Sequence, residues 1–234
     1  CLMCGIAGKV VFGGAVDEAL IQRMCSAMEH RGPDSRGVHV SDGVGLGIQR
    51  LRIIDLTTGS QPIASEDGRS QIVVNGEFYD YESIQRELEA NGHRLRTRSD
   101  SEIALHLYQD LGPQCLHRLR GEFAFILWDA NHRTLFAARD RFGIKPLFYA
   151  FYEEKLYLAS EVKALFAAGI PARWDAESVA QSIEGGGHQI RTLFDGVFQV
   201  PPGHYLLATD RHFQLVPYWD FNYPPADSAA PTKT

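Results

Sequence analysis

The cysteine at position 4 is the first residue in the sequence whose type and setting could support catalysis. Cys4 is followed by Gly5 and by an apolar run over residues 5–12. Because glycine lets a substrate approach the backbone closely, this pattern suits a nucleophile at the start of a buried strand. A thiol at a chain terminus also has a base at hand, since an α-amino group has an unperturbed pKa of about 7.7 to 8.0.

The other thiols do not indicate a metal or redox centre. Cys1 and Cys4 form a C-x-x-C pair, but no second cysteine pair or histidine pair accompanies it at ligand spacing. Cys25 lies in a helical pattern and Cys115 follows a Gly-Pro break, so both are expected to be packed, reduced thiols. We expect no metal and no disulfide framework.

Two further segments could be mistaken for catalytic motifs. His30 and Arg31, within HRGPD at 30–34, could supply a general base or a phosphate clamp, but a helix ending in Gly-Pro needs a turn, which favours a structural role. The three glycines at 185–187 lack the preceding strand and following helix that a phosphate loop requires.

Many short strands and a few helices must position these residues. Apolar or alternating runs predict strands at 5–12, 43–54, 71–78, 122–129, 134–140, 147–152, 155–160, 203–209 and 213–219. Amphipathic spacing with capping residues predicts helices at 17–30, 81–91, 100–111, 160–168 and 175–183. Because the strands come in hairpin-like runs, the pattern favours an α+β fold with stacked antiparallel sheets.

Composition narrows the classes of partner. The chain has 234 residues, 44% of them hydrophobic, which suffices for one substantial core. A formal net charge of −6 makes nucleic acid an unlikely partner. No apolar run approaches the roughly 20 residues that span a bilayer, and the first residues lack the basic region of a secretory signal, so we expect a soluble, cytoplasmic protein with no membrane partner. Residues 223–234, rich in Pro, Ala, Ser and Thr, are expected to form a linker or disordered tail.

The sequence also contains a series of motifs whose order is informative about its family. In order, it contains MCGIAG (3–8), HRGPD (30–34), QRLRIIDL (49–56), VVNGEFYD (73–80), SDSE (99–102), GEFAFILWD (121–129), RDRFGIKPLFY (139–149), ASEVKAL (159–165) and PPGHYL (201–206). This series resembles the glutaminase domain of the asparagine synthetase B family, a family of class II (N-terminal nucleophile) glutamine amidotransferases. The resemblance extends over residues 3–222. It implies one domain over residues 1–222 with the four-layer αββα sandwich of N-terminal nucleophile hydrolases.

The resemblance also implies an activity. The family hydrolyses L-glutamine to glutamate through a cysteinyl thioester and supplies ammonia to an asparagine-synthetase-like amidating domain or partner, without a cofactor for this half-reaction. The family's ATP-dependent synthetase domain carries a motif resembling SGGLDS, and no such motif occurs in these residues. Two alternatives remain open: γ-glutamyl transfer to another nucleophile such as hydroxylamine, or a non-catalytic regulatory domain.

Residue by residue, the resemblance assigns a catalytic set. Cys4 matches the nucleophile, while the Asn75 side chain and the Gly76 N–H match the donors that hold the oxyanion of the tetrahedral intermediate. The plainer interpretation of Asn75–Gly76 is a hairpin turn, which an Asn-Gly pair favours by itself.

A second set would recognise the ends of glutamine. Arg50 matches the arginine that binds the α-carboxylate, and Asp100 matches the acid that binds the α-ammonium with help from Glu77. By residue type alone, Arg50 could be a charge at a strand edge and Asp100 a helix N-cap. The pocket would also be lined through backbone groups by Leu51, Ile53 and Ile54.

The first three residues bear on the mechanism. Cys1, Leu2 and Met3 precede Cys4, and while they remain attached Cys4 has no free α-amine. Translation from Met3 or proteolytic trimming would expose the amine. Retention of the three residues would instead favour the non-catalytic alternative.

Overall fold

The computed structural model describes residues 3–41, 43–51, 59–187 and 189–223. Within them the strands form two antiparallel sheets of six strands each. The first sheet has the order β10 (Val197–Gln199), β8 (Phe148–Tyr152), β9 (Lys155–Ala159), β1 (Gly5–Val10), β3 (Val44–Arg50) and β2 (Ser35–Ser41). The second has the order β12 (Phe213–Pro217), β11 (His204–Ala208), β7 (Thr134–Arg139), β6 (Gly121–Asp129), β5 (Ser70–Phe78) and β4 (Ile63–Ala64).

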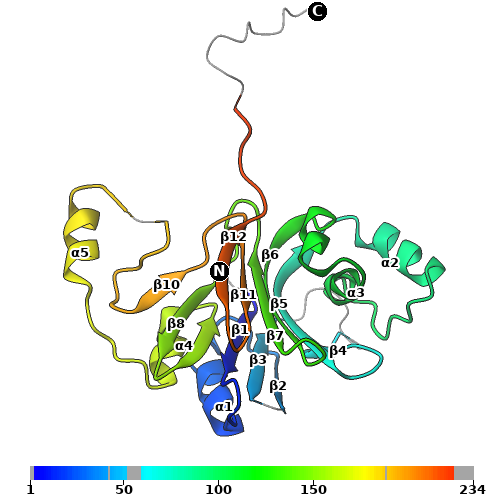
Figure 1. Ribbon diagram of the computed structural model, residues 1–234, viewed down its shortest axis with the longest axis horizontal. Coiled ribbons are helices and arrows are strands. Elements are labelled where there is room, and N and C mark those ends of the chain that lie inside the picture. Colours follow the sequence, from blue (N-terminus) through cyan, green and yellow to red (C-terminus); the bar gives the residue numbers. More distant parts are fainter. Residues whose placement is uncertain (1–2, 42, 52–58, 188, 224–234) are drawn as a thin grey trace, which may run out of the picture.

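Helices cover the outer face of each sheet (Figure 1). Helices α1 (Glu18–Ser26) and α4 (Val162–Ala167) pack on the first sheet. Helices α2 (Tyr81–Ala90) and α3 (Glu102–Leu111), with the 3₁₀ helix η1 (Gly112–His117), lie against the second. Helix α5 (Ala176–Ile183) stands at the side of the first sheet in Figure 1. This arrangement confirms the predicted four-layer αββα sandwich.

Strand β6 is buried on both faces, which explains its uninterrupted apolar sequence. Alternate side chains of a strand point to opposite faces. Phe123 and Phe125 pack toward the helices on the outer face, while Ala124 and Ile126 pack between the sheets. Because both faces of the strand are buried, the run GEFAFILWD carries no polar alternation.

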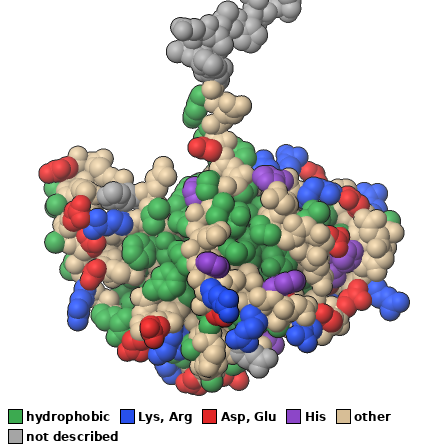
Figure 2. All heavy atoms as spheres, in the orientation of Figure 1, with side chains coloured by type: hydrophobic (Ala, Val, Ile, Leu, Met, Phe, Trp, Pro, Cys, Tyr) green, Lys and Arg blue, Asp and Glu red, His purple; other side chains and the backbone are tan. Residues whose placement is uncertain are grey.

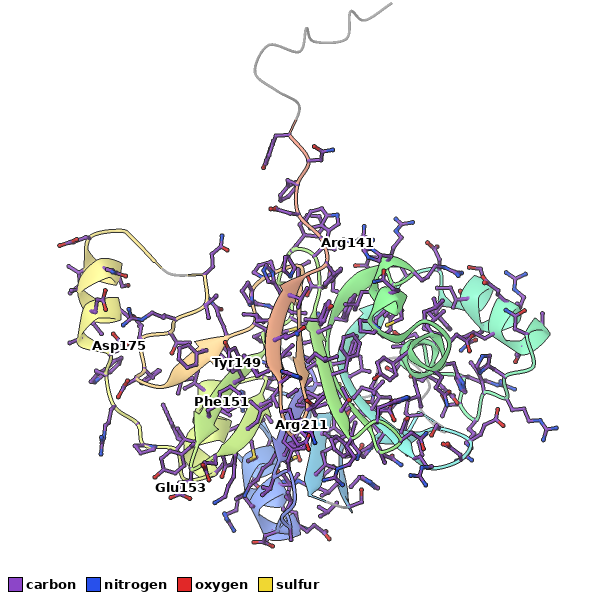
Figure 3. All side chains as sticks on the ribbon, viewed as in Figure 1. Arg141, Tyr149, Phe151, Glu153, Asp175 and Arg211 are labelled. Atoms are coloured by element: carbon purple, nitrogen blue, oxygen red, sulfur yellow. The ribbon has the colours of Figure 1, made fainter. Side chains whose placement is uncertain are left out.

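Aromatic contacts join the two sheets at one edge. Tyr149 and Phe151 of β8 are labelled in Figure 3. Their ring centroids lie 5.6 Å and 4.7 Å, respectively, from that of Phe213 of β12. Figure 2 shows hydrophobic side chains across the middle of the same face and charged side chains around its periphery. The sheets are thus packed together by apolar contacts along this edge as well as in the interior.

All nine predicted strands and all five predicted helices correspond to elements of the structure, with most ends one to several residues shorter. The segment that forms the edge strand β2 was not predicted, because Val38 and Val40 are its only large apolar residues and make too short an alternation to indicate a strand. The short strands β4 and β10 and the helix η1 were also missed. The predicted strand 43–54 ends at Arg50, and residues 52–58 lie outside the described part.

Two local interpretations were wrong. Asn75 and Gly76 do not form a hairpin turn but lie within β5, opposite Ala124 and Phe123. Asp100 is not a helix cap, since α3 begins at Glu102 and its N-cap position is Ser101.

Two classes of feature are absent from the described residues. No helix among them has the length and apolar character needed to cross a membrane. No group of three or more His, Cys, Asp or Glu side chains in these ranges is arranged to hold a metal ion. Of the predicted tail at residues 223–234, only Tyr223 belongs to the described part of the chain.

Candidate active site

Cys4 lies immediately before β1, a central strand of the first sheet. Its Sγ accepts a hydrogen bond from the Leu51 N–H at 3.3 Å, and its carbonyl oxygen accepts one from Arg31 Nε at 2.9 Å. The thiol is half-buried. Burial raises the pKa of the Cys4 thiol, whereas the Leu51 N–H and the positive charges of Arg50 and Arg31 act in the opposite direction. The thiol therefore needs a base to become a nucleophile near neutral pH.

A pocket beside Cys4 brings most of the predicted site together. Of the nine predicted site residues, seven line it, and Ile53 and Ile54 lie outside the described residues. The lining residues are Met3, Cys4, Arg50, Leu51, Gln61, Val74, Asn75, Gly76, Glu77, Ser99, Asp100, Ser101 and Lys145. They come from both sheets, so the pocket exists only once the sandwich is assembled.

Asn75 occupies an unusual position for a buried amide. Its side chain is 1% exposed, and neither Oδ1 nor Nδ2 has a hydrogen-bond partner among the described residues. Buried polar atoms are nearly always paired, because an unmade hydrogen bond costs about 1–3 kcal/mol. An amide left unpaired beside a thiol is available to a ligand that enters the pocket.

Gly76 is required by the backbone at this point of β5. Its φ of +141° lies in a region that residues with a side chain rarely adopt, and a Cβ atom there would collide with the Glu122 carbonyl oxygen. The conformation is compatible only with glycine, which lets β5 pass close to β6. The pairing of β5 with β6 therefore requires glycine at position 76.

Two buried charges of opposite sign face the pocket. Arg50, at the end of β3, is 6% exposed, and Asp100, ahead of α3, is 3% exposed. Asp100 Oδ2 accepts a hydrogen bond from the Phe78 N–H at 2.7 Å. Burial raises the pKa of Asp100, while the Phe78 hydrogen bond opposes this rise. A positively charged ligand group would stabilise the carboxylate further.

Gln61 was missed by sequence reasoning, although it connects two parts of the site. Its Oε1 accepts from the Val74 N–H at 2.6 Å, and its Nε2 donates to Ser101 Oγ at 3.3 Å. The side chain therefore ties β5, next to Asn75, to the segment that carries Asp100. A buried glutamine before a proline has no local pattern that would reveal these partners.

The HRGPD segment supports the site from outside the pocket. Besides binding the Cys4 carbonyl, Arg31 pairs through Nη1 with Glu161 Oε1 at 3.0 Å. His30 is half exposed, contacts the same carboxylate at 2.9 Å and is not among the pocket residues. This arrangement is consistent with the structural role predicted for the segment, and Arg31 adds direct contact with Cys4.

Comparison with known proteins identifies the family. Residues 3–219 match the glutamine amidotransferase domain. The amidase chry2 of Gibberella zeae is 40% identical over 239 residues, covering 95% of this chain and 35% of that protein. The glutamine-hydrolyzing asparagine synthetase 1 of Bacillus subtilis is 37% identical, covering 97% of this chain and 37% of that protein.

A solved structure supports the same assignment at the level of fold. The glutamine phosphoribosylpyrophosphate amidotransferase of B. subtilis, complexed with ADP and GMP, superposes with a TM-score of 0.68 at 18% identity, covering 92% of this chain and 49% of that one. The chain spans about a third of the length of the curated relatives it matches. The matched family model, the sequence shared with the relatives and the αββα architecture together show that the chain is a glutamine amidotransferase domain and belongs to the class II glutamine amidotransferases.

Proposed function

We propose that this domain hydrolyses L-glutamine to L-glutamate with Cys4 as the nucleophile, and that the ammonia passes to an asparagine-synthetase-like amidating domain or partner. The observation that carries the proposal is the unpaired, buried Asn75 amide in the same pocket as the Cys4 thiol. A nucleophile and a free hydrogen-bond donor around one cavity are the elements that acyl transfer requires.

Recognition of glutamine would use the two buried charges. Arg50 would bind the α-carboxylate through its planar guanidinium, and Asp100 would bind the α-ammonium, with Glu77 beside it. The opposite signs of Arg50 and Asp100 match the two charges of a free amino acid. Leu51 would contribute backbone groups, as predicted for Ile53 and Ile54.

The proposed chemistry proceeds through a thioester. The α-amine of Cys4 takes the thiol proton, and Sγ attacks the side-chain carbonyl carbon of glutamine. Asn75 Nδ2 and the Gly76 N–H stabilise the resulting oxyanion. The amide nitrogen then takes the proton from the α-ammonium and leaves as ammonia. Water, deprotonated by the same amine, attacks the thioester and releases glutamate and the thiol.

Product analysis with a competing nucleophile tests this proposal. Protein whose first residue is Cys4 is expected to release glutamate and ammonia in equal amounts. With hydroxylamine, γ-glutamyl hydroxamate should replace part of the glutamate while ammonia release continues, because both nucleophiles attack the same thioester. Absence of ammonia release would support the non-catalytic alternative. Hydroxamate formation far faster than hydrolysis would identify a γ-glutamyl transferase.

Replacing Asn75 by alanine should lower kcat about 10²–10³-fold with a smaller change in KM, since the amide would act mainly on the transition state. Folding stability should change little, because the side chain has no hydrogen bond to lose among the described residues. Steady-state kinetics and urea unfolding measure the two effects. A variant with wild-type kcat would show that the oxyanion is held elsewhere.

The destination of the ammonia is part of the proposal. The two curated relatives are about three times as long as this chain, and one of them is an asparagine synthetase. We propose that the glutaminase unit covers residues 1–222 and that residues 223–234 connect it to an amidating domain. The motif of the ATP-dependent domain does not occur in these residues. We propose that a separate domain or a partner protein carries that activity.

A further inference from the structure

The loop after β7 is built to hold one lysine. Asp140 is fully buried, and its Oδ1 accepts the N–H groups of Phe142 and Ile144, both at 3.0 Å. Its Oδ2 accepts the N–H of Lys145 at 2.9 Å. The Lys145 carbonyl accepts a hydrogen bond from Arg139 Nε, also at 2.9 Å. Charged groups thus fix the Lys145 backbone on both sides, which preorganises its side chain.

That side chain reaches the catalytic pocket. Lys145 lines the pocket together with Cys4, and its side chain is 12% exposed. Its Nζ lies 3.3 Å from Glu122 Oε2 and 3.3 Å from Met3 Sδ. Because Met3 directly precedes Cys4, bond lengths limit its sulfur to about 6 Å from the Cys4 nitrogen. The ammonium is therefore within about 10 Å of that nitrogen.

We propose that Lys145 is a positioning residue that acts through the Cys4 α-amine, keeping this amine in its neutral, basic form. The inference rests on the proposed function, in which the amine accepts the thiol proton. A nearby positive charge disfavours protonation of an amine and lowers its pKa. The charged side chains that face the pocket or pair with those that do are Arg31, Arg50, Lys145, Glu77, Asp100 and Glu122.

Bound substrate would affect the charge of Lys145 differently from the charges of Arg50 and Asp100. In the proposed complex, glutamine neutralises Arg50 with its carboxylate and Asp100 with its ammonium. The Lys145 ammonium has instead a counter-charge in Glu122, which also accepts a hydrogen bond from the Tyr79 hydroxyl at 3.1 Å. Its influence on the amine therefore persists through the reaction and depends on Glu122.

The pH dependence of kcat/KM tests the inference. In protein that begins at Cys4, the acid limb of the profile for glutamine hydrolysis follows deprotonation of the α-ammonium. Lys145→Met removes the charge at similar size and should move this limb upward by about half to one pH unit, with rates converging at high pH. Lys145→Arg should keep the limb near its original position. Glu122→Gln should move it downward, since the Lys145 charge then acts without its partner.

Lys155→Met is the matched control. Lys155 pairs with Glu153 at 3.0 Å and is the first residue of β9. The next residue, Leu156, pairs with Val10, which lies at the end of β1 farthest from Cys4. Its profile should match that of the unaltered protein. NMR titration of ¹⁵N-labelled cysteine gives the α-amine pKa directly and should show the same order without any turnover.

The outcomes separate the inference from the proposed function. An unchanged acid limb in active Lys145→Met, or an equal loss at every pH, overturns the role of Lys145 and leaves the glutaminase proposal intact. No glutamate release from the unaltered Cys4-first protein at any pH overturns the proposed function itself. If Lys145→Met does not fold, an unmoved limb and amine pKa in Glu122→Gln overturn the inference.

Discussion

Cys4→Ala is expected to abolish glutamate release from glutamine, because the proposed thioester cannot form without the thiol. Cys25→Ala and Cys115→Ala should stay within a few-fold of the unaltered rate. Both of these thiols are fully buried in the outer cores, and burial raises the pKa of each to about 12. Neither can supply a thiolate to the pocket near neutral pH.

A coupled glutamate assay on protein beginning at position 4 measures the effect. Circular dichroism and thermal unfolding establish that the Cys4→Ala variant remains folded. The half-buried side chain makes this substitution less disruptive than one in the core. Glutamate release at the unaltered rate in this variant would remove Cys4 from the mechanism.

A chain that begins at Cys4 should hydrolyse glutamine at least about 10²-fold faster than one that retains residues 1–3, the low end of what a positioned base contributes. Burial raises the pKa of the Cys4 thiol, so little thiolate exists near pH 7 without a base. A peptide bond to Met3 turns the amine into an amide without useful basicity. Among the described residues that line the pocket there is no histidine to replace it.

The comparison needs two forms verified by intact mass, one processed from Met-Cys4 and one with Cys1, Leu2 and Met3 attached. Both should fold, since the Met3 N–H donates to the Arg31 carbonyl at 3.0 Å and Met3 is accommodated as a lining residue of the pocket. Equal rates would assign the base to another group, and Cys1→Ala would then test whether the terminal cysteine takes that role.

Strand-level features of this protein could be predicted because they depend on local pattern. The apolar run at 122–129 predicted a strand that corresponds to β6, and the helix predicted at 100–111 corresponds to α3, which ends at Leu111. The ordered motifs also indicated the family, since several short segments in register carry information that no single Asn-Gly pair contains. Seven of the nine predicted site residues consequently line one pocket.

The partners of those residues were decided by tertiary structure. An Asn-Gly pair favours a turn by itself, but pairing with β6 holds Asn75 within a strand and leaves its amide unpaired. Asp100 binds the Phe78 N–H instead of capping α3. Arg31 and Lys145 reach the neighbourhood of Cys4 from 27 and 141 positions away along the sequence. Sequence alone determined which side chains were available, whereas the packing of two sheets determined their distances, burial and charge environment, because these depend on contacts between segments that local patterns do not specify.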